Sequence, residues 1–278
     1  MFGMLETPPN TQTVTKRSVR STPPQALAFF RIACGVILLS IWLAPLFNGT
    51  ILSEGEHLLL LGMILMALFL TIGAWFRYVT VYLAILYALE LALMMQAGIE
   101  TNGVTSIEQA ALFIPVLLVL AFSGADRAYS YTMYLRYGSP WEWEDVHSLP
   151  QQLLKIILAL SYLYIGAFLL WQPLWMSGMR LRSALVGSLG TMLGARLARS
   201  DVPPAFFQWS LYITKALVLM LPFSLWMKQI RMIFIVIGVL LHVAAGILFG
   251  TWWPIILVAG LPLFLVSEIS SPKAKVVQ

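Results

Sequence analysis

Long apolar runs separated by short polar connections make up most of this chain. Eight of the runs approach the roughly 20 residues that a helix rising about 1.5 Å per residue needs to cross a bilayer. They lie at about 26–47, 57–76, 78–97, 109–124, 152–171, 205–226, 231–250 and 252–268. The runs are continuously apolar and show no period of two, so strands are not expected. The pattern predicts an all-α fold, a polytopic transmembrane helical bundle of about eight spans.

Composition excludes a water-soluble domain. Only 10% of the 278 residues are charged, 60% are hydrophobic and the mean hydropathy is +0.85. Soluble domains carry about 25% charged residues, so this chain has too few charges for a water-exposed surface. The single cysteine, Cys34, lies in the first apolar run, which excludes a disulfide or a thiolate metal cluster within the chain.

The basic residues predict how the chain is oriented in the membrane. Residues 1–24 contain Lys16, Arg17 and Arg20, whereas the connection at 48–56 has two glutamates and no Lys or Arg. Lys and Arg favour the cytoplasmic side, so the first helix is predicted to enter from the cytoplasm. The same side is then predicted for Arg31, Arg77, Arg127, Arg136, Lys155, Lys228, Arg231, Lys273 and Lys275. The net charge of +5 is therefore interpreted as orientation, and no nucleic-acid partner is expected.

This topology divides the chain into a polar cytoplasmic tail at 1–24, a single transmembrane domain at 25–270 and a short cytoplasmic tail at 271–278. One connection fits poorly, because it is predicted outside although it carries Arg180, Arg182, Arg196 and Arg199. A ninth span at 183–198 would worsen the charge bias, so eight spans are preferred. Residues 181–198 are instead predicted to form an interfacial or re-entrant helix between the fifth and sixth spans.

Three ionisable residues fall deep within predicted spans: Glu90, Lys215 and His242. Each costs at least about 2.5–3.5 kcal/mol in the bilayer centre, so each needs a reason to be there. A structural reason is a neutral acid, a neutral imidazole joining two helices, or an ion pair between Lys215 and Glu90. A functional reason is catalysis, and these three residues are the catalytic candidates.

Tyrosine hydroxyls near these residues predict a polar cavity. Tyr162 and Tyr164 lie on the fifth span, and Tyr212 lies one turn before Lys215, so these three tyrosines are candidate ligand-binding residues. A quinone or a lipid is the ligand class that such a cavity would hold. No spacing typical of a metal site occurs, so no metal is predicted.

Five short segments, taken in order, resemble a known family. They are residues 28–35 (AFFRIACG), 124–130 (GADRAYS), 160–166 (LSYLYIG), 175–178 (WMSG) and the late His242. This order is similar to that of bacterial proteins related to the membrane part of vitamin K-dependent γ-carboxylase, the HTTM (horizontally transferred transmembrane) family. The resemblance covers about residues 26–266 and implies a multi-pass protein of the bacterial inner membrane.

The chain departs from this family where the chemistry matters most. In the carboxylase, a lysine after the fifth-span motif is the base that deprotonates vitamin K hydroquinone, and the corresponding residues here are Ala167 and Phe168. The resemblance therefore implies a relative that does not carboxylate.

Two functions remain open. The first is a non-enzymatic accessory or structural subunit of a membrane assembly or of a peptide-maturation system. Its partners would be membrane lipids together with other membrane subunits or a peptide substrate. The second is a membrane enzyme or a quinone- or lipid-binding protein with a site around Lys215 and His242. A transporter is disfavoured because no internal repeat is visible.

Overall fold

A computed structural model describes residues 21–47, 54–96, 105–171, 177–187, 190–249 and 255–265. Its helices are α1 (Gln25–Phe47), α2 (Glu54–Ile72), α3 (Phe76–Gln96), α4 (Thr105–Ala121), α5 (Tyr131–Tyr137), α6 (Leu149–Trp171), α7 (Gly178–Val186), α8 (Met192–Arg199), α9 (Pro204–Ser224), α10 (Arg231–Phe249), α11 (Ile255–Gly260) and α12 (Pro262–Leu265). Two short strands, β1 (Ser21–Thr22) and β2 (Val146–His147), accompany them.

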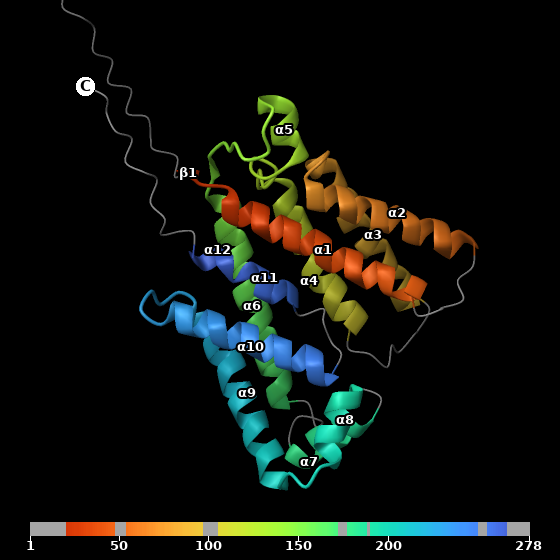
Figure 1. The fold of residues 1–278 in the computed structure, drawn as a ribbon, viewed down its shortest axis with the longest axis vertical. Coiled ribbons are helices and arrows are strands. Elements are labelled where there is room, and N and C mark those ends of the chain that lie inside the picture. The colour runs from red at the N-terminus through yellow and green to blue at the C-terminus, as the bar shows by residue number, and fades with distance from the viewer. Residues whose placement is uncertain are drawn as a thin grey trace, which may run out of the picture.

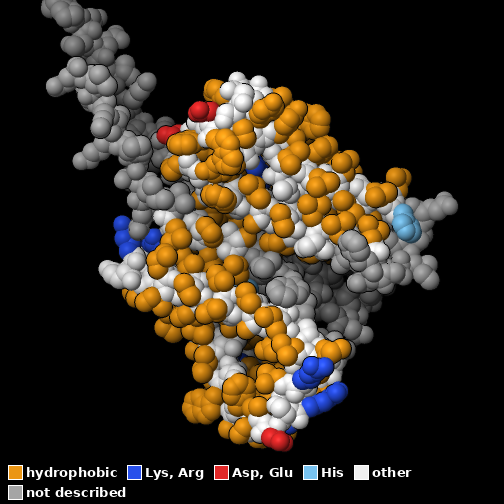
Figure 2. Space-filling model, viewed as in Figure 1, with side chains coloured by type: hydrophobic (Ala, Val, Ile, Leu, Met, Phe, Trp, Pro, Cys, Tyr) orange, Lys and Arg blue, Asp and Glu red, His pale blue; other side chains and the backbone are white. Residues whose placement is uncertain are grey.

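Four helices are long and apolar enough to cross a membrane: the first 19 residues of α1, and all of α6, α9 and α10. Shorter apolar stretches occur at Leu60–Ile72, Phe76–Leu89 and Leu112–Ala121. Figure 2 shows hydrophobic side chains over most of the visible face, with the charged ones near its edges. A mostly helical chain with four helices long and apolar enough to cross a membrane is thus confirmed within the described residues, and the count of eight spans stays a prediction.

The helices form two groups joined through their middle (Figure 1). Helices α1 and α2 pack together, as do α3 and α4, while α6 packs against α9 and α10 contacts α9. The short pair α11 and α12 touches α1 and α6, and α11 also touches α10, so the end of the chain connects the two groups. One hydrophobic core runs through both of them.

The last predicted span, 252–268, is not one continuous helix in the part of it that the structure describes. Helix α11 ends at Gly260 and α12 begins at Pro262, so the helix is interrupted at Leu261. Proline has no backbone N–H and disfavours helical geometry in the residue before it, which explains the break. The prediction of a single helix there was wrong within residues 255–265.

The arginine-rich connection forms two short helices, α7 and α8, at the bundle end where α6 stops and α9 starts. With nine and eight residues, neither helix reaches the roughly 20 residues needed to cross a bilayer. The Thr191 backbone N–H, just before α8, donates to the Leu248 carbonyl of α10 over 2.9 Å. The Gly178 N–H donates to the Gln208 side chain of α9 over 2.6 Å. Both short helices are therefore fixed to the bundle, and their depth in the membrane stays a prediction.

The connections that the charge pattern assigns to the cytoplasm gather at the other end of the bundle. Strands β1 and β2 pair antiparallel there, with Ser21 opposite His147, so the expectation of no strands was wrong by one short ladder. At the same end, Arg231 donates through Nη1 to the Phe264 carbonyl over 2.8 Å. The Gln151 amide donates to the Leu263 carbonyl over 2.9 Å. The grouping agrees with the predicted topology, although which side it faces stays a prediction.

Candidate functional site

A buried arginine organises the end of the bundle that carries β1 and β2. The Arg31 side chain on α1 is fully buried. Its Nη1 donates to the Ala125 carbonyl over 3.0 Å, and its Nη2 donates to the Tyr129 carbonyl over 2.7 Å. A longer contact of 3.4 Å joins Nη2 to the Thr71 carbonyl at the end of α2. Asp126 provides an opposite charge nearby. Arg31 therefore ties α1, α2 and the loop between α4 and α5 together.

The turn between α2 and α3 leaves room for this guanidinium because it carries a glycine. Gly73 has a φ of +71°, and a Cβ there would come within 2.4 Å of Arg31 Nη1 and 2.6 Å of Ser130 Cβ. Its carbonyl accepts a hydrogen bond from Thr132 Oγ1 over 2.9 Å. Ser130 then caps α5 by accepting from the Met133 N–H over 3.1 Å. The buried charge and the start of α5 are thus built as one unit.

Two of the segments on which the family resemblance rests meet in this unit. Arg31 belongs to residues 28–35, and the carbonyls that it binds belong to residues 124–130. From sequence alone, Arg31 was interpreted as a charge flanking the first span, and burial corrects that interpretation. Lys155 and Arg231 were also assigned to cytoplasmic connections, yet both are buried. Sequence hydropathy cannot separate a flanking charge from a buried one at a helix end.

A polar basin of about 430 Å³ opens beside the Arg31 unit. Arg77 from α3, Arg127 and Asp126 from the α4–α5 loop, and Arg136 from α5 line it, with His147 of β2 at its edge. The ladder between β1 and β2 fixes the backbone position of His147. His147 Nδ1 accepts the Leu149 N–H over 3.0 Å, which leaves the ring proton on Nε2 as a free donor.

Glu144 is the counter-ion of two basin arginines. Its Oε1 accepts hydrogen bonds from Arg136 Nη1 over 2.6 Å and from the Tyr137 hydroxyl over 2.5 Å. Its Oε2 lies 3.7 Å from Arg127 Nη1. The Tyr137 hydroxyl, then Arg136 and Arg127, hold the pKa of the Glu144 carboxyl below its ordinary value. The same contacts raise the pKa of Tyr137 and of Arg136.

We expect this cluster to loosen only in acid. A carboxyl with a lowered folded pKa stabilises the fold above its ordinary pKa of about 4.3, and that contribution is lost as the pH falls through the lower folded value. With ¹³C-labelled glutamate carboxyls, the signal missing in Glu144→Gln should titrate below about 4.3. Its midpoint should rise in Tyr137→Phe. A midpoint that is unchanged by Tyr137→Phe would show that the hydroxyl contact does not form.

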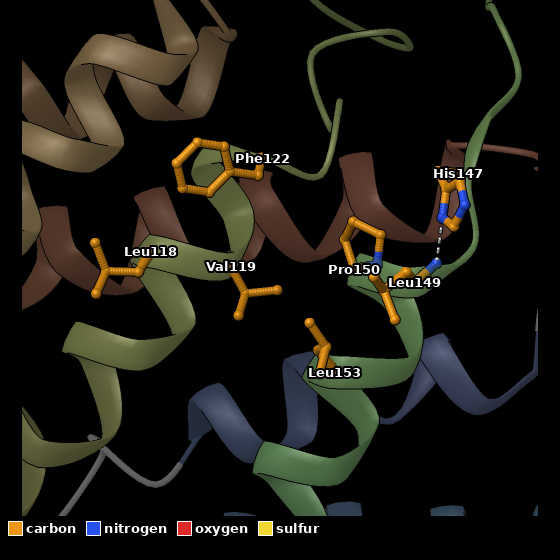
Figure 3. Close-up of a pocket in the computed structure, with 7 residues that line it drawn as sticks. All are labelled: Leu118, Val119, Phe122, His147, Leu149, Pro150 and Leu153. Carbon is orange, nitrogen blue, oxygen red and sulfur yellow. Dashed lines mark hydrogen bonds between the residues drawn. The ribbon is translucent and has the colours of Figure 1, made fainter.

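An apolar groove of about 490 Å³ lies next to the basin, between α4 and α6. Figure 3 shows Leu118, Val119 and Phe122 on the α4 side facing Leu149, Pro150 and Leu153 of α6, with His147 above them. Phe122 and His147 line both the groove and the basin. The two spaces are therefore adjacent, one apolar and the other polar and basic.

The predicted intramembrane site is only partly assembled. Tyr162 of α6 and His242 of α10 lie edge to face, with ring centroids 5.6 Å apart. The Tyr162 hydroxyl is buried and has no hydrogen-bond partner in the part of the chain that the structure describes. His242 Nδ1 is 2.7 Å from the Gly238 carbonyl of its own helix. This imidazole therefore has a local structural contact, and the nearby phenol has an unused donor.

The other candidates divide between buried and exposed positions. Lys215 is buried on the face of α9 that also carries Leu211 and Val218. The side chains of Tyr164 and Tyr212 are 59% and 50% exposed. They point away from the core, so they do not form a shared cavity with Tyr162. The Glu90 backbone lies in α3, but its side chain is outside the described residues, as is any ion pair with Lys215. Among the described residues, no cluster of metal-ligating side chains occurs.

Sequence reasoning missed the basin and its groove. Arg77, Arg127 and Arg136 were each interpreted only as charges that set orientation. The sequence did contain a signal for a polar site here. The apolar run ends at Phe122 and is followed by the polar turn residues Ser123 and Gly124 and then by the charged pair Asp126 and Arg127. What could not be foreseen is that distant arginines converge there, because the convergence depends on how α3, α4 and α5 pack.

Comparison with known proteins adds no further constraint. No family model, no curated protein and no solved structure matches this chain. The resemblance to the carboxylase-related family therefore stays a proposal that rests on the five segments.

Proposed function

We propose that the protein is a non-carboxylating accessory or structural membrane subunit, related to the carboxylase-like family and located in a bacterial inner membrane with both termini cytoplasmic. This proposal rests on the contacts of the buried basic side chains, which join different elements of the fold. Arg31 and Arg231 donate to backbone carbonyls of other elements, and Lys155 Nζ lies 5.5 Å from the centre of the Phe264 ring. These cations hold the fold together, which is an architectural and not a catalytic use.

The surface of α10 supports a role within an assembly. Only 11% of the most apolar 18-residue stretch of α10 is buried inside the structure. Its mean hydropathy of 2.7 is nevertheless the highest among the four helices that are long enough to span a membrane. Met232, Val236 and Leu240 all lie on its exposed side. A membrane subunit packed there would replace lipid contacts with close van der Waals packing between helices, which drives helix association in a bilayer. Another membrane protein or a membrane-bound peptide substrate is the proposed partner.

A second function has an observation of its own. The Tyr162 hydroxyl, which has no partner among the described residues and lies beside His242, supports a quinone- or lipid-binding site within the membrane. A ligand carbonyl would satisfy the phenol, which otherwise loses a hydrogen bond on burial. In that case the protein would be a binding protein or an enzyme.

One purification separates the two functions. The protein is expressed at its native level and extracted in mild detergent. Native mass spectrometry then measures the mass of the intact complex, and the small molecules that copurify with it are extracted and identified. The accessory function predicts a stoichiometric partner chain that is lost in the double variant Val236→Trp/Leu240→Trp. It also predicts that Lys215→Met and His242→Ala change nothing that copurifies.

The ligand-binding function predicts the opposite result. A lipid-like molecule should be lost in Tyr162→Phe and His242→Ala but kept in Tyr164→Phe, a matched control because Tyr164 is 59% exposed. A ligand-free monomer in every preparation would overturn both functions.

A further inference from the structure

The groove and the basin together form one amphipathic site. The groove is lined by aliphatic and aromatic side chains, the basin is lined by arginines, and Phe122 and His147 belong to both. A ligand that fills both spaces needs an apolar part joined directly to a polar, anionic head. That requirement describes a membrane lipid.

The charges of the basin set the sign of the head. Three arginines, Arg77, Arg127 and Arg136, and one carboxylate, Asp126, line the basin. Buried Arg31 and the carboxylate of Glu144 lie beside it. Asp126 balances Arg31, and Glu144 is shared by Arg127 and Arg136. Arg77 has no ion pair within the described ranges. The side chains that line the basin therefore carry a net charge of +2, which favours an anion, and arginine binds phosphate oxygens through two parallel N–H donors.

The site also lies where a lipid headgroup would be. Five exposed aromatic residues surround α5 and the loop after it: Tyr131, Tyr134, Tyr137, Trp141 and Trp143. Tyrosine and tryptophan are enriched at the membrane–water boundary, which places the basin at headgroup depth. Basic pockets between transmembrane helices at the cytoplasmic boundary are typical sites for anionic lipid headgroups.

The groove favours a lipid over a soluble phosphate compound. Phe122 is 70% exposed and Leu149 is 55% exposed, so the groove opens sideways on the apolar surface of the bundle. An acyl chain could enter it directly from the bilayer without crossing water. A soluble anion would use the basin alone and leave the groove unexplained.

We propose that the α4–α6 groove and the adjacent arginine basin bind one membrane lipid with an anionic phosphate headgroup. Its acyl chain lies against Leu118, Phe122 and Leu153, and its phosphate contacts Arg77 and Arg127, with His147 Nε2 as a further donor. This inference depends neither on the accessory function nor on the intramembrane site around Tyr162.

The test measures lipid retention by the whole chain. Protein in detergent is incubated with phosphatidylglycerol or phosphatidylcholine, and bound lipid is counted by native mass spectrometry. We expect phosphatidylglycerol to be preferred, and Arg77→Gln/Arg127→Gln to weaken its binding by roughly thirtyfold, since each arginine near an anionic surface contributes about a factor of five. Both residues are exposed, so the double variant should still fold.

Two controls make the outcome decisive. Arg180→Gln/Arg196→Gln removes the same charge from exposed positions at the other end of the bundle and should retain the lipid. Leu153→Trp should fill the groove and weaken phosphatidylglycerol without changing the basin. Equal loss in both arginine double variants would overturn the proposal in favour of non-specific attraction. Displacement of the lipid by millimolar glycerol phosphate, with Leu153→Trp having no effect, would assign the basin to a soluble phosphate and overturn it too.

Discussion

Arg31→Met should destabilise the protein more than any exposed charge substitution. The variant leaves the carbonyls of Ala125 and Tyr129 without their donor, and Asp126 without its counter-charge. Removing one member of a buried polar network costs about 3–5 kcal/mol. For a chain of this size the midpoint of thermal unfolding should fall by roughly 10 °C. Fluorescence-detected size exclusion after heating in detergent measures it.

Two comparisons show whether the effect comes from the buried contacts. Arg180→Met removes an exposed arginine by the same substitution and should leave the melting temperature within about 2 °C. Arg31→Lys keeps a charge but cannot span both carbonyls with a planar fork, so it should melt between the wild type and Arg31→Met. If Arg31→Met melted like Arg180→Met, the buried arginine would not organise this end of the bundle.

Gly73→Ala should have the second largest effect. The backbone there has a φ of +71°, which costs an alanine about 1–2 kcal/mol. The new methyl group would also lie within 2.4 Å of Arg31 Nη1 and would push the guanidinium away from its carbonyls. Together these effects should lower the free energy of unfolding by about 2–4 kcal/mol. Thermal unfolding in detergent is again the measurement.

The matched control is Gly62→Ala on α2. A Cβ there has nothing within 4 Å, and alanine suits a helix interior better than glycine, so stability should stay constant or rise by up to about 1 kcal/mol. In the double variant Arg31→Met/Gly73→Ala, the part of the Gly73 effect that comes from the clash with the guanidinium should disappear, whereas the close approach to Ser130 Cβ remains. Strict additivity of the two effects would mean that Gly73→Ala does not act through Arg31.

The apolar runs predicted the helices well because in a bilayer a helix follows directly from composition. Helices α1, α6, α9 and α10 lie within a few residues of the predicted runs. Where a turn depended on one local residue, sequence could indicate it only in part, as at Pro262, which divides the last run. Residues 28–35 and 124–130 are two of the five segments on which the resemblance to the carboxylase-related family rests. Their direct contact through Arg31 was not predicted.

The candidate site shows the limit of such reasoning. Burial cost directed attention to Lys215, His242 and Glu90, and among the described side chains the ligand candidate Tyr162 lies against His242. Tyr164 and Tyr212 fall on exposed faces, because small differences in helix rotation decide which side of a span faces lipid. Nothing in the pattern of one sequence measures that rotation.

By itself, the sequence predicted a chain of helices long and apolar enough to cross a membrane, because too few charges are present to give it a water-exposed surface. It also predicted that most charged groups lie near the ends of the spans. Only the tertiary structure decided which of those charges are buried as supports, as Arg31 is, and which converge on an open basin, as Arg77 and Arg127 do. The physical reason is that hydropathy is a property of each segment, whereas a site is made where segments far apart in the chain pack together.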